Sequence, residues 1–229
     1  MEMPVEVRAW ERQVAEALRP AGVEAFGICW GAPRSWDEGS SRVVPRADGT
    51  RLLLAHDERE APYALGPDGR EDAGLLVSLS DEDALAACAW ARVAPGSGVA
   101  GLGIDLADPR DFAGARGERF NRLLFTQAEQ GLVPALAHGD EALGYAYAFS
   151  AKEAAFKACA APLRRWYEAH DEELVFDLRG FELADLRHEA GTARGGAAQA
   201  ALDALGIRAI ELFRTEVQGC ACTVAWARA

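Results

Sequence analysis

Apolar residues recur along this chain with two different periods, which predict helices and strands in mixed order. Val7, Trp10 and Val14 stand three and four residues apart, so residues 7–19 are expected to form an amphipathic helix that ends at Pro20. Similar spacing predicts further helices at 116–130, 141–161 and 197–205. Short apolar runs between turn-forming residues predict strands at 23–30, 52–54, 75–80, 85–93, 99–106, 174–178, 207–213 and 217–226. Because strands and helices do not alternate regularly, the pattern favours an α+β fold over a parallel α/β fold.

Glycine, proline and charged residues delimit these elements. Residues 31–51 and 57–74 are rich in them, so both segments are expected to be mainly loops. Pro162 is expected to end the helix at 141–161, because proline has no backbone N–H and clashes with the preceding turn. Gly206 is expected to end the helix at 197–205, just before the C-terminal hairpin.

A short internal repeat suggests that the chain has two related parts. Ala89-Trp90-Ala91-Arg92 recurs as Ala225-Trp226-Ala227-Arg228, at an offset of 136 residues, and each copy ends an apolar run typical of a strand. The repeat fits two related halves better than a single wound sheet. We therefore expect an N-terminal half at 1–100 and a C-terminal half at 101–229, joined in one compact pseudo-dimeric unit.

The composition argues against several classes of protein. The 229 residues include 36 acidic and 24 basic side chains, which gives a net charge of -12. This acidity argues against a broad nucleic-acid surface, because phosphate binding needs a basic face. The chain has no run of about 20 uncharged apolar residues to span a membrane, and its first ten residues do not resemble a secretory signal. We therefore expect a cytoplasmic protein that binds neither nucleic acid nor membrane.

Cysteine, histidine and glycine motifs add little chemistry. The five cysteines include no Cys-x-x-Cys pair and are expected to be reduced core thiols, while the four histidines lack metal-ligand spacing. Gly96-x-Gly98-x-x-Gly101 matches the dinucleotide-binding string, but that motif works only where a strand leads into a helix. Because another strand is expected here, nucleotide binding through these glycines is not.

The two lysines of the chain point to a functional segment. Every other basic residue is arginine, whereas Lys152 and Lys157 lie five residues apart on the long helix. Glu153 and Lys157 share one helical face, and Asp105 ends the strand of the preceding unit. A strand carboxylate and a helix carboxylate could hold Mg²⁺, with Lys157 one turn away to meet a phosphate. The alternative is a surface Glu–Lys pair, but that would not require lysine in place of arginine.

These residues resemble the signature of the 4'-phosphopantetheinyl transferases. The signature is matched by Gly103-Ile104-Asp105 and by Phe149-Ser150-Ala151-Lys152-Glu153-Ala154-x-x-Lys157. Between them, Arg119-Phe120 and the segment Leu124-Phe125-Thr126 with Glu129 are similar to part of the holo-acyl-carrier-protein synthases. Upstream, Val77-Ser78-Leu79-Ser80 resembles a strand of the double-length, surfactin-type members.

The resemblance implies a fold, a reaction and a set of site residues. The implied fold has two pseudo-symmetric halves, each a small antiparallel sheet packed on a long helix, and the protein would be a monomer. The reaction would move the phosphopantetheine arm of coenzyme A to a serine of an acyl or peptidyl carrier protein, in fatty-acid or polyketide biosynthesis. Asp105 and Glu153, with Asp108 as a further candidate, would bind Mg²⁺. Glu153 and Lys157 would be catalytic. Ser80, Lys152 and Lys157 would bind the coenzyme A co-substrate.

The chain departs from the family pattern at two positions near this site. Asp81 follows Ser80 where many surfactin-type members have histidine, and a carboxylate there would repel a phosphate. Ala107 stands where the family usually has a second acidic residue after Asp105. A second hypothesis therefore stays open: a degenerate or repurposed transferase fold that binds a carrier protein, or acts on its acyl chain, without phosphopantetheinyl transfer.

Overall fold

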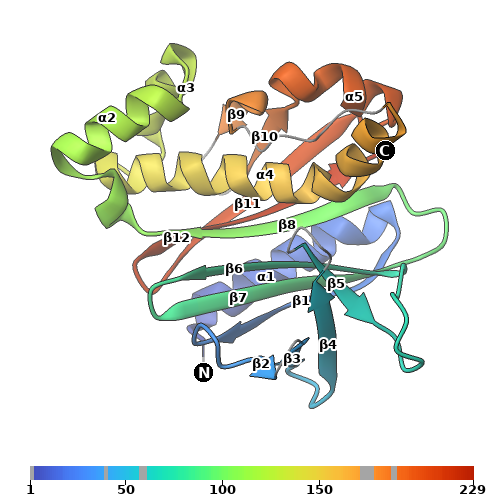
Figure 1. Cartoon of the computed structure of the whole chain (residues 1–229). Helices are drawn as coiled ribbons and strands as arrows, with labels where there is room; N and C mark the ends of the chain where they lie inside the picture. Colours follow the sequence, from blue (N-terminus) through green and yellow to red (C-terminus); the bar gives the residue numbers. More distant parts are fainter. Residues whose placement is uncertain (1–2, 39–40, 57–60, 171–177, 187–189) are drawn as a thin grey trace.

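The computed structural model describes residues 3–38, 41–56, 61–170, 178–186 and 190–229, and its strands form three antiparallel sheets. The first sheet has the order β1-β7-β6, with β1 at Val23–Gly31, β7 at Leu85–Val93 and β6 at Leu75–Glu82. The second has the order β8-β12-β11-β10-β9, with β8 at Val99–Ala107, β12 at Cys220–Arg228, β11 at Ala209–Val217, β10 at Ala190–Arg194 and β9 at Glu182–Leu186. The third comprises β2 at Asp37–Glu38, β3 at Ser41–Pro45, β4 at Arg51–His56 and β5 at Pro62–Leu65. The expected α+β class is confirmed (Figure 1).

Helices cover the first and second sheets. The α-helices are α1 at Val5–Leu18, α2 at Gly114–Leu124, α3 at Gln127–Leu132, α4 at Glu141–Ala169 and α5 at Gln199–Ala204. Short 3-10 helices are η1 at Arg19–Ala21, η2 at Pro109–Phe112, η3 at Val133–Ala135, η4 at Leu178–Gly180 and η5 at Gly196–Ala198. The long helix α4 lies along β8, and α1 packs behind the first sheet (Figure 1). The first and second sheets therefore each pack against a helix, as expected.

Helix α4 continues past the proline that was expected to end it. Pro162 is buried inside the helix, which runs on to Ala169. Its missing N–H would have bonded to the carbonyl of Ala158, four residues earlier. That carbonyl faces β8 so closely that a Cβ on Gly101 would come within 1.9 Å of its oxygen. The prediction of a stop at Pro162 was wrong because packing against β8 holds the helix together across the proline.

Glycine makes this close approach possible. A Cβ on Gly103 would lie 2.0 Å from the carbonyl oxygen of Ala154 and 2.7 Å from the backbone nitrogen of Ala158. Only a residue without a side chain fits under the helix at such distances. The glycine-rich string around Gly101 thus belongs to a strand and its helix contact, in agreement with the expectation that it is no dinucleotide loop.

Other local expectations were wrong where short elements depend on their neighbours. The helix expected at 116–130 is two helices, because Thr126 interrupts it and caps α3 through a capping box with Glu129. Strands β3 and β5 lie in segments expected to be loops, and they are held by packing of the third sheet on the first. Of the strand expected at 174–178, residues 174–177 lie outside the described part, and Leu178 begins η4.

The two copies of the repeated tetrapeptide have equivalent places in the first and second sheets. Trp90 lies on β7 and Trp226 on β12, and each of these strands is flanked by two neighbours within its sheet. Ala89 and Ala91 belong to the core that contains α1, whereas Ala225 and Ala227 belong to the core that contains α4. In both copies the alanines thus share a core with a helix. The core around α1 also includes residues of β8 and β12, so the two sheets share one interior, and the division at residue 100 stays a prediction.

Within the described residues, no helix is both long enough and apolar enough to cross a membrane.

Candidate functional site

A cavity of about 300 Å³ opens where the first and second sheets meet. Strand β6 runs beside β8 there, and α4 lies along β8 (Figure 1). The residues that line the cavity come from these three elements: Leu79, Ser80, Asp81, Glu82, Asp105, Leu106, Phe149, Glu153 and Lys157. The sequence-predicted residues Ser80, Asp105, Glu153 and Lys157 are therefore brought together in one wall.

Serine hydroxyls on β6 join the two sheets beside the cavity. The backbone N–H of Ile104 donates to the Ser78 hydroxyl at 3.0 Å, and that of Leu106 donates to the Ser80 hydroxyl at 3.1 Å. The Ser80 hydroxyl in turn donates to Oδ1 of Asp105 at 3.0 Å. Side chains from one sheet thus satisfy the edge of the other, and they hold Asp105 in place.

The Lys157 ammonium lies between the two carboxylates of the site. Its Nζ is 2.7 Å from Oδ1 of Asp105 and 3.6 Å from Oε2 of Glu153, and it also donates to the carbonyl of Ile104 at 3.2 Å. Asp105 is buried, whereas Lys157 and Glu153 are partly exposed to the cavity. Glu153 and Lys157 are therefore not an isolated surface pair, the alternative considered above, but part of a three-residue cluster that includes a strand carboxylate.

Burial and mutual repulsion shift the ionisation of this cluster. Burial raises the pKa of Asp105, although Lys157 and Ser80 oppose the shift. Burial and the neighbouring Asp105 charge raise the pKa of Glu153, against the effect of Lys157. Burial alone would lower the pKa of Lys157, but Asp105 and Glu153 outweigh it, so that pKa is raised above its usual value. Glu153 is consequently a better proton acceptor than an ordinary exposed glutamate.

The residues expected to bind a metal are partly assembled. Within the described residues, no three His, Cys, Asp or Glu side chains converge as a ready-made metal site. A cationic ammonium nevertheless already lies between Oδ1 of Asp105 and Oε2 of Glu153. Because Mg²⁺ commonly uses one or two carboxylates and completes its shell with water and substrate phosphate, this pair fits such an ion.

Asp108 lies apart from this pair. Its side chain accepts from the backbone N–H of Arg110 at 2.7 Å and caps η2. The Arg110 guanidinium bonds to Asp108 and also to Asp83 at the end of β6. The structure therefore gives Asp108 a capping role and does not bring it into the cavity wall.

Lys152 also lies apart, on the buried side of α4. Its ammonium donates to both carboxylate oxygens of Glu129 at 2.9 and 3.1 Å, and to the carbonyl of Leu124 at 3.2 Å. The Lys152 and Glu129 side chains are only 1% and 2% exposed. Lys152 thus joins α4 to α3 inside the core, and it does not line the cavity.

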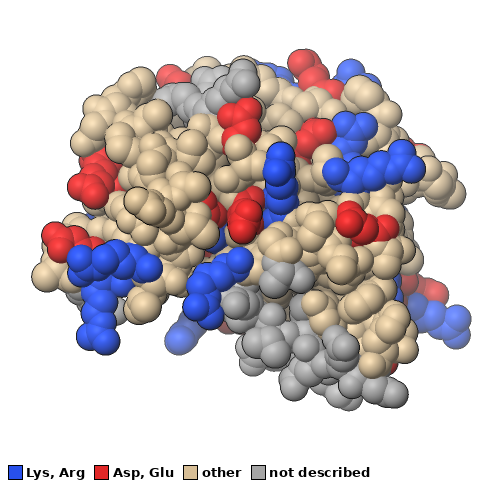
Figure 2. Space-filling view, turned by 90° about the horizontal axis from the view of Figure 1, so that it is seen from above, with Lys and Arg blue, Asp and Glu red and all other residues tan. Residues whose placement is uncertain are grey.

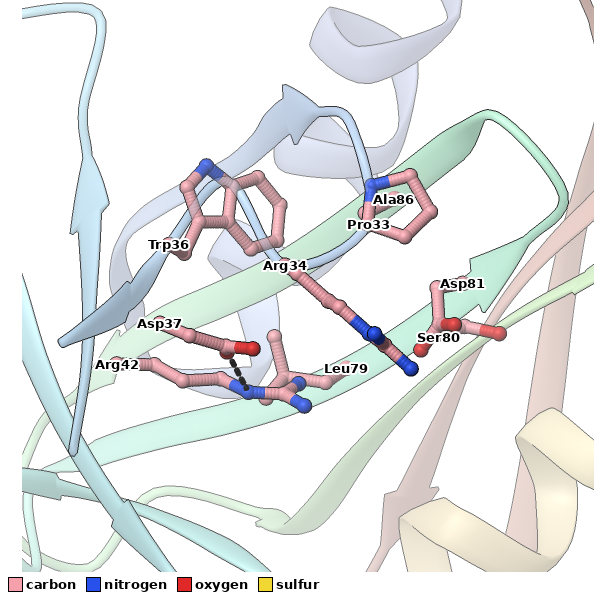
Figure 3. Close-up of a pocket in the computed structure, with 9 residues that line it drawn as sticks. All are labelled: Pro33, Arg34, Trp36, Asp37, Arg42, Leu79, Ser80, Asp81 and Ala86. Carbon is pink, nitrogen blue, oxygen red and sulfur yellow. Dashed lines mark ion pairs between the residues drawn. The ribbon is translucent and has the colours of Figure 1, made fainter. Parts of the chain in front are cut away.

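A second cavity continues from the first across Leu79, Ser80 and Asp81. Its outer wall comes from the segment before and within the small third sheet and includes Arg34, Trp36 and Arg42. Figure 3 shows the guanidinium of Arg34 directed toward Ser80 and Asp81, whereas Arg42 is paired with Asp37 at 3.0 Å. Arginines recur in residues 31–51 and could supply positive charge from loops, but no pattern in the sequence placed Arg34 and Arg42 beside Ser80.

Charges of both signs surround the cavity. Burial, together with repulsion from neighbouring carboxylates of which Asp111 and Asp108 have the largest effect, raises the pKa of Glu82 to about 7. On the face seen in Figure 2, the coloured basic and acidic side chains are interspersed. Near the first cavity, α2 exposes Phe120 and Leu123, with 38% and 63% of their surfaces accessible, beside the exposed Arg122. Phe120 also packs against Phe149 of the cavity wall, with ring centroids 6.0 Å apart.

Comparisons with known proteins match the same part of the chain. Residues 101–212 match the model of the 4'-phosphopantetheinyl transferase superfamily. A holo-[acyl-carrier-protein] synthase of Geobacter metallireducens is 42% identical over 85 residues, which are 36% of this chain and 66% of that protein. A crystal structure of the holo-[acyl-carrier-protein] synthase from Neisseria meningitidis covers 57% of this chain and 99% of its own, at 18% identity and a TM-score of 0.38. At this score the structural likeness is weak, so the assignment depends on the sequence matches. The segment matched by the family model contains Asp105, Glu153 and Lys157, and the sequence matches support membership of the chain in the 4'-phosphopantetheinyl transferase superfamily.

Proposed function

We propose that this protein transfers the 4'-phosphopantetheine arm of coenzyme A to a serine of an acyl carrier protein. The observation that carries the proposal is the cluster of Asp105, Lys157 and Glu153 in a cavity between the two sheets. In the reaction, the serine oxygen bonds to the phosphorus that bears the pantetheine arm. The bond from that phosphorus to the bridging oxygen of the pyrophosphate breaks, the nucleotide leaves as adenosine 3',5'-bisphosphate, and the serine proton passes to a base.

Glu153 is the base in this proposal. Its carboxylate lines the cavity, and burial beside Asp105 raises its pKa toward the range that suits proton transfer near neutral pH. Lys157 supplies a positive charge at the same place, because its ammonium remains protonated while it stabilises charge on the transferring phosphoryl group. Ser80 holds Asp105 through its hydroxyl and completes the wall from the other sheet.

Asp105 and Glu153 would hold Mg²⁺. Such an ion, when bound, neutralises pyrophosphate charge and favours departure of the nucleotide. The ammonium of Lys157 now lies between the two carboxylates, so Lys157 must turn toward the substrate phosphate when a metal ion takes that place. Its partial exposure to the cavity leaves room for this movement.

The neighbouring cavity suits the remaining, anionic end of coenzyme A. Arg34 is directed into it, and Arg42 lines it together with the ring of Trp36 (Figure 3). Guanidinium groups bind phosphate oxygens, and an indole ring offers an apolar surface to a base. Carrier proteins are acidic, so the exposed face of α2, with Arg122 beside Leu123, is the docking face in this proposal.

Intact mass spectrometry of an apo acyl carrier protein tests the proposal. Incubation with coenzyme A, Mg²⁺ and this protein should add the mass of one phosphopantetheine arm. Glu153→Gln and Lys157→Ala should each abolish the mass gain while thermal unfolding stays cooperative. Glu141→Gln is the matched control, because Glu141 is an exposed glutamate at the start of the same helix. Undiminished transfer by either site variant would refute the assignment of roles.

Asp81 favours a second candidate function. This carboxylate lines both cavities, where it would repel coenzyme A phosphates. A repurposed fold would bind a loaded carrier protein, or act on its acyl chain, without phosphopantetheinyl transfer. It would give no mass gain with any apo carrier protein, yet would bind the holo or acylated form in a titration calorimeter. Recovery of transfer in Asp81→His would show that this single carboxylate separates the two functions.

A further inference from the structure

Three neighbouring strands carry polar residues in one row beneath α4. Thr223 of β12 lies opposite Asp105 of β8 on one side and opposite Arg214 of β11 on the other. Residues opposite each other in an antiparallel sheet direct their side chains to the same face. On this face Lys157 of α4 contacts Asp105, and the Arg214 guanidinium lies 5.3 Å from the ring centre of Tyr147. The row therefore leads from the cavity into the interior under the helix.

The row concentrates polar atoms that have no partner. Asp105, Thr223 and Arg214 are 3%, 0% and 1% exposed. Among the described residues, eight buried side-chain nitrogen or oxygen atoms lack a hydrogen bond, and five of them belong to this row. They are Oδ2 of Asp105, Oγ1 of Thr223, and Nε, Nη1 and Nη2 of Arg214. Native proteins rarely leave such atoms unsatisfied, so their concentration in one row calls for a common partner.

The three groups follow one another along the row in an order that suits a chain of hydrogen bonds. A guanidinium only donates hydrogen bonds, and a carboxylate oxygen only accepts them. A threonine hydroxyl does both, and Thr223 stands between the other two. Burial lowers the pKa of Arg214 to about 10, which still leaves the guanidinium charged at neutral pH. The ring of Tyr147 attracts the positive charge of Arg214, but this contact leaves the N–H groups of the guanidinium without hydrogen-bond acceptors.

We propose that Arg214, Thr223 and Asp105 form a buried polar relay completed by bound water, in which Arg214 donates to the Thr223 hydroxyl and that hydroxyl donates to Oδ2 of Asp105. The relay fixes Oδ2 inside the protein and leaves Oδ1 directed at Lys157 and the cavity. Arg214 and Thr223 are then positioning residues for the candidate metal ligand. This role rests on the proposed function, because it affects transfer only if Asp105 binds the metal.

Isosteric substitution at Thr223 isolates the relay. Thr223→Val removes the hydroxyl and keeps the shape, and Thr223→Ser restores the hydroxyl. Thr215→Val is the control, because Thr215 lies next to Arg214 on β11 but on the opposite, half-buried face. Electron paramagnetic resonance of Mn²⁺ then reports binding by the folded protein without any need for turnover. Loss of an outer hydrogen bond to a metal ligand commonly weakens metal binding or activity by about tenfold or more.

Thr223→Val should therefore bind Mn²⁺ about tenfold more weakly. It should also lower kcat with little change in KM for coenzyme A, while Thr223→Ser and Thr215→Val behave as the unmodified protein. A folded Thr223→Val with unchanged Mn²⁺ affinity would overturn the relay. If Thr223→Val does not fold, Arg214→Met provides the same comparison from the other end of the row.

A high-resolution crystal structure of the unmodified protein decides the case independently of activity. Ordered water or direct bonds linking Oδ2 of Asp105 to the Thr223 hydroxyl would support the relay, even if no carrier protein is modified. An Arg214 side chain turned out to solvent, with Oδ2 bonded outside the row, would overturn it. Absence of transfer with the relay intact would refute the proposed function alone.

Discussion

Replacing Lys152 with methionine removes one partner of an ion pair that lies wholly inside the protein. The Lys152 ammonium makes three hydrogen bonds, two of them to Glu129, and both side chains are almost fully buried. Methionine has a similar length and an apolar end, so the substitution removes the charge and the donors but little volume. It leaves Glu129 as a buried carboxylate without a counter-ion.

The expected cost follows from what remains around Glu129. Loss of one partner of a buried pair destabilises a protein by about 3–5 kcal/mol. Two backbone donors stay in place, because the N–H of Leu183 donates to Oε1 at 3.0 Å and that of Thr126 donates to Oε2 at 2.8 Å. We therefore expect a loss near the lower end, about 3 kcal/mol. With a urea m-value of about 2–3 kcal/mol/M, the unfolding midpoint should fall by roughly 1 M.

Urea unfolding followed by tryptophan fluorescence measures this shift. Adding Glu129→Gln to Lys152→Met removes the stranded charge and keeps one acceptor, so the double variant should be more stable than the single one. The KM for coenzyme A should stay unchanged in the folded Lys152→Met protein, since Lys152 does not line the cavity. An unchanged midpoint combined with a raised KM would contradict this reasoning, because the lysine would then have to reach the co-substrate.

Three further predictions concern packing, pH and docking. Gly103→Ala should lower the free energy of unfolding by about 2–4 kcal/mol, because the added Cβ would lie 2.0 Å from a carbonyl oxygen of α4, and thermal unfolding measures this loss. The control Gly131→Ala, which has open space around it, should be neutral or slightly stabilising. The pKa of Glu82 is raised from 4.5 to about 7 in the folded protein, so folding favours its protonated form, and the free energy of unfolding should fall as pH rises between these values. Glu82→Gln should flatten this pH dependence, and an unchanged dependence would exclude Glu82 as its cause. Arg122→Glu should raise the KM for an acidic carrier protein and weaken its salt dependence without changing the KM for coenzyme A, and equal KM values for the carrier would argue against docking on α2.

The elements that the sequence predicted well are those whose own pattern is sufficient. Strands such as β7 and β8 are continuous apolar runs, and their residues are buried on both faces. Strands β3 and β5 are shorter and mix apolar with polar residues, and they form because the third sheet packs onto the first. Pro162 carries a strong local signal for a helix end, yet contacts with β8 override it. Local patterns failed where tertiary packing decides.

The site divides in the same way. The spacing of Glu153 and Lys157 placed them on one helical face, and the structure brings both to the cavity. Lys152 precedes Glu153 by one residue, which is about 100° around the helix, so the same periodicity directs it elsewhere. The sequence did contain its partner, because Glu129 lies in the Phe-Thr-x-x-Glu segment, but no local pattern connects positions 129 and 152. Thr223 was not singled out, because its place depends on pairing between strands that are distant in the sequence.

The cavity includes residues that lie outside the segment matched by the family model, and the site depends on them. The match covers residues 101–212, which include Asp105 and the face of α4 that carries Glu153 and Lys157. The hydroxyl that holds Asp105 belongs to Ser80 on β6, before the match begins, and the strand that pairs with β8 inside its sheet is β12, at Cys220–Arg228, after the match ends. The matched segment alone would leave the Asp105 strand without either neighbour and the cavity without its β6 wall. Asp105, Lys157 and Glu153 thus all lie within the matched segment, whereas the geometry in which they meet also depends on strands outside it.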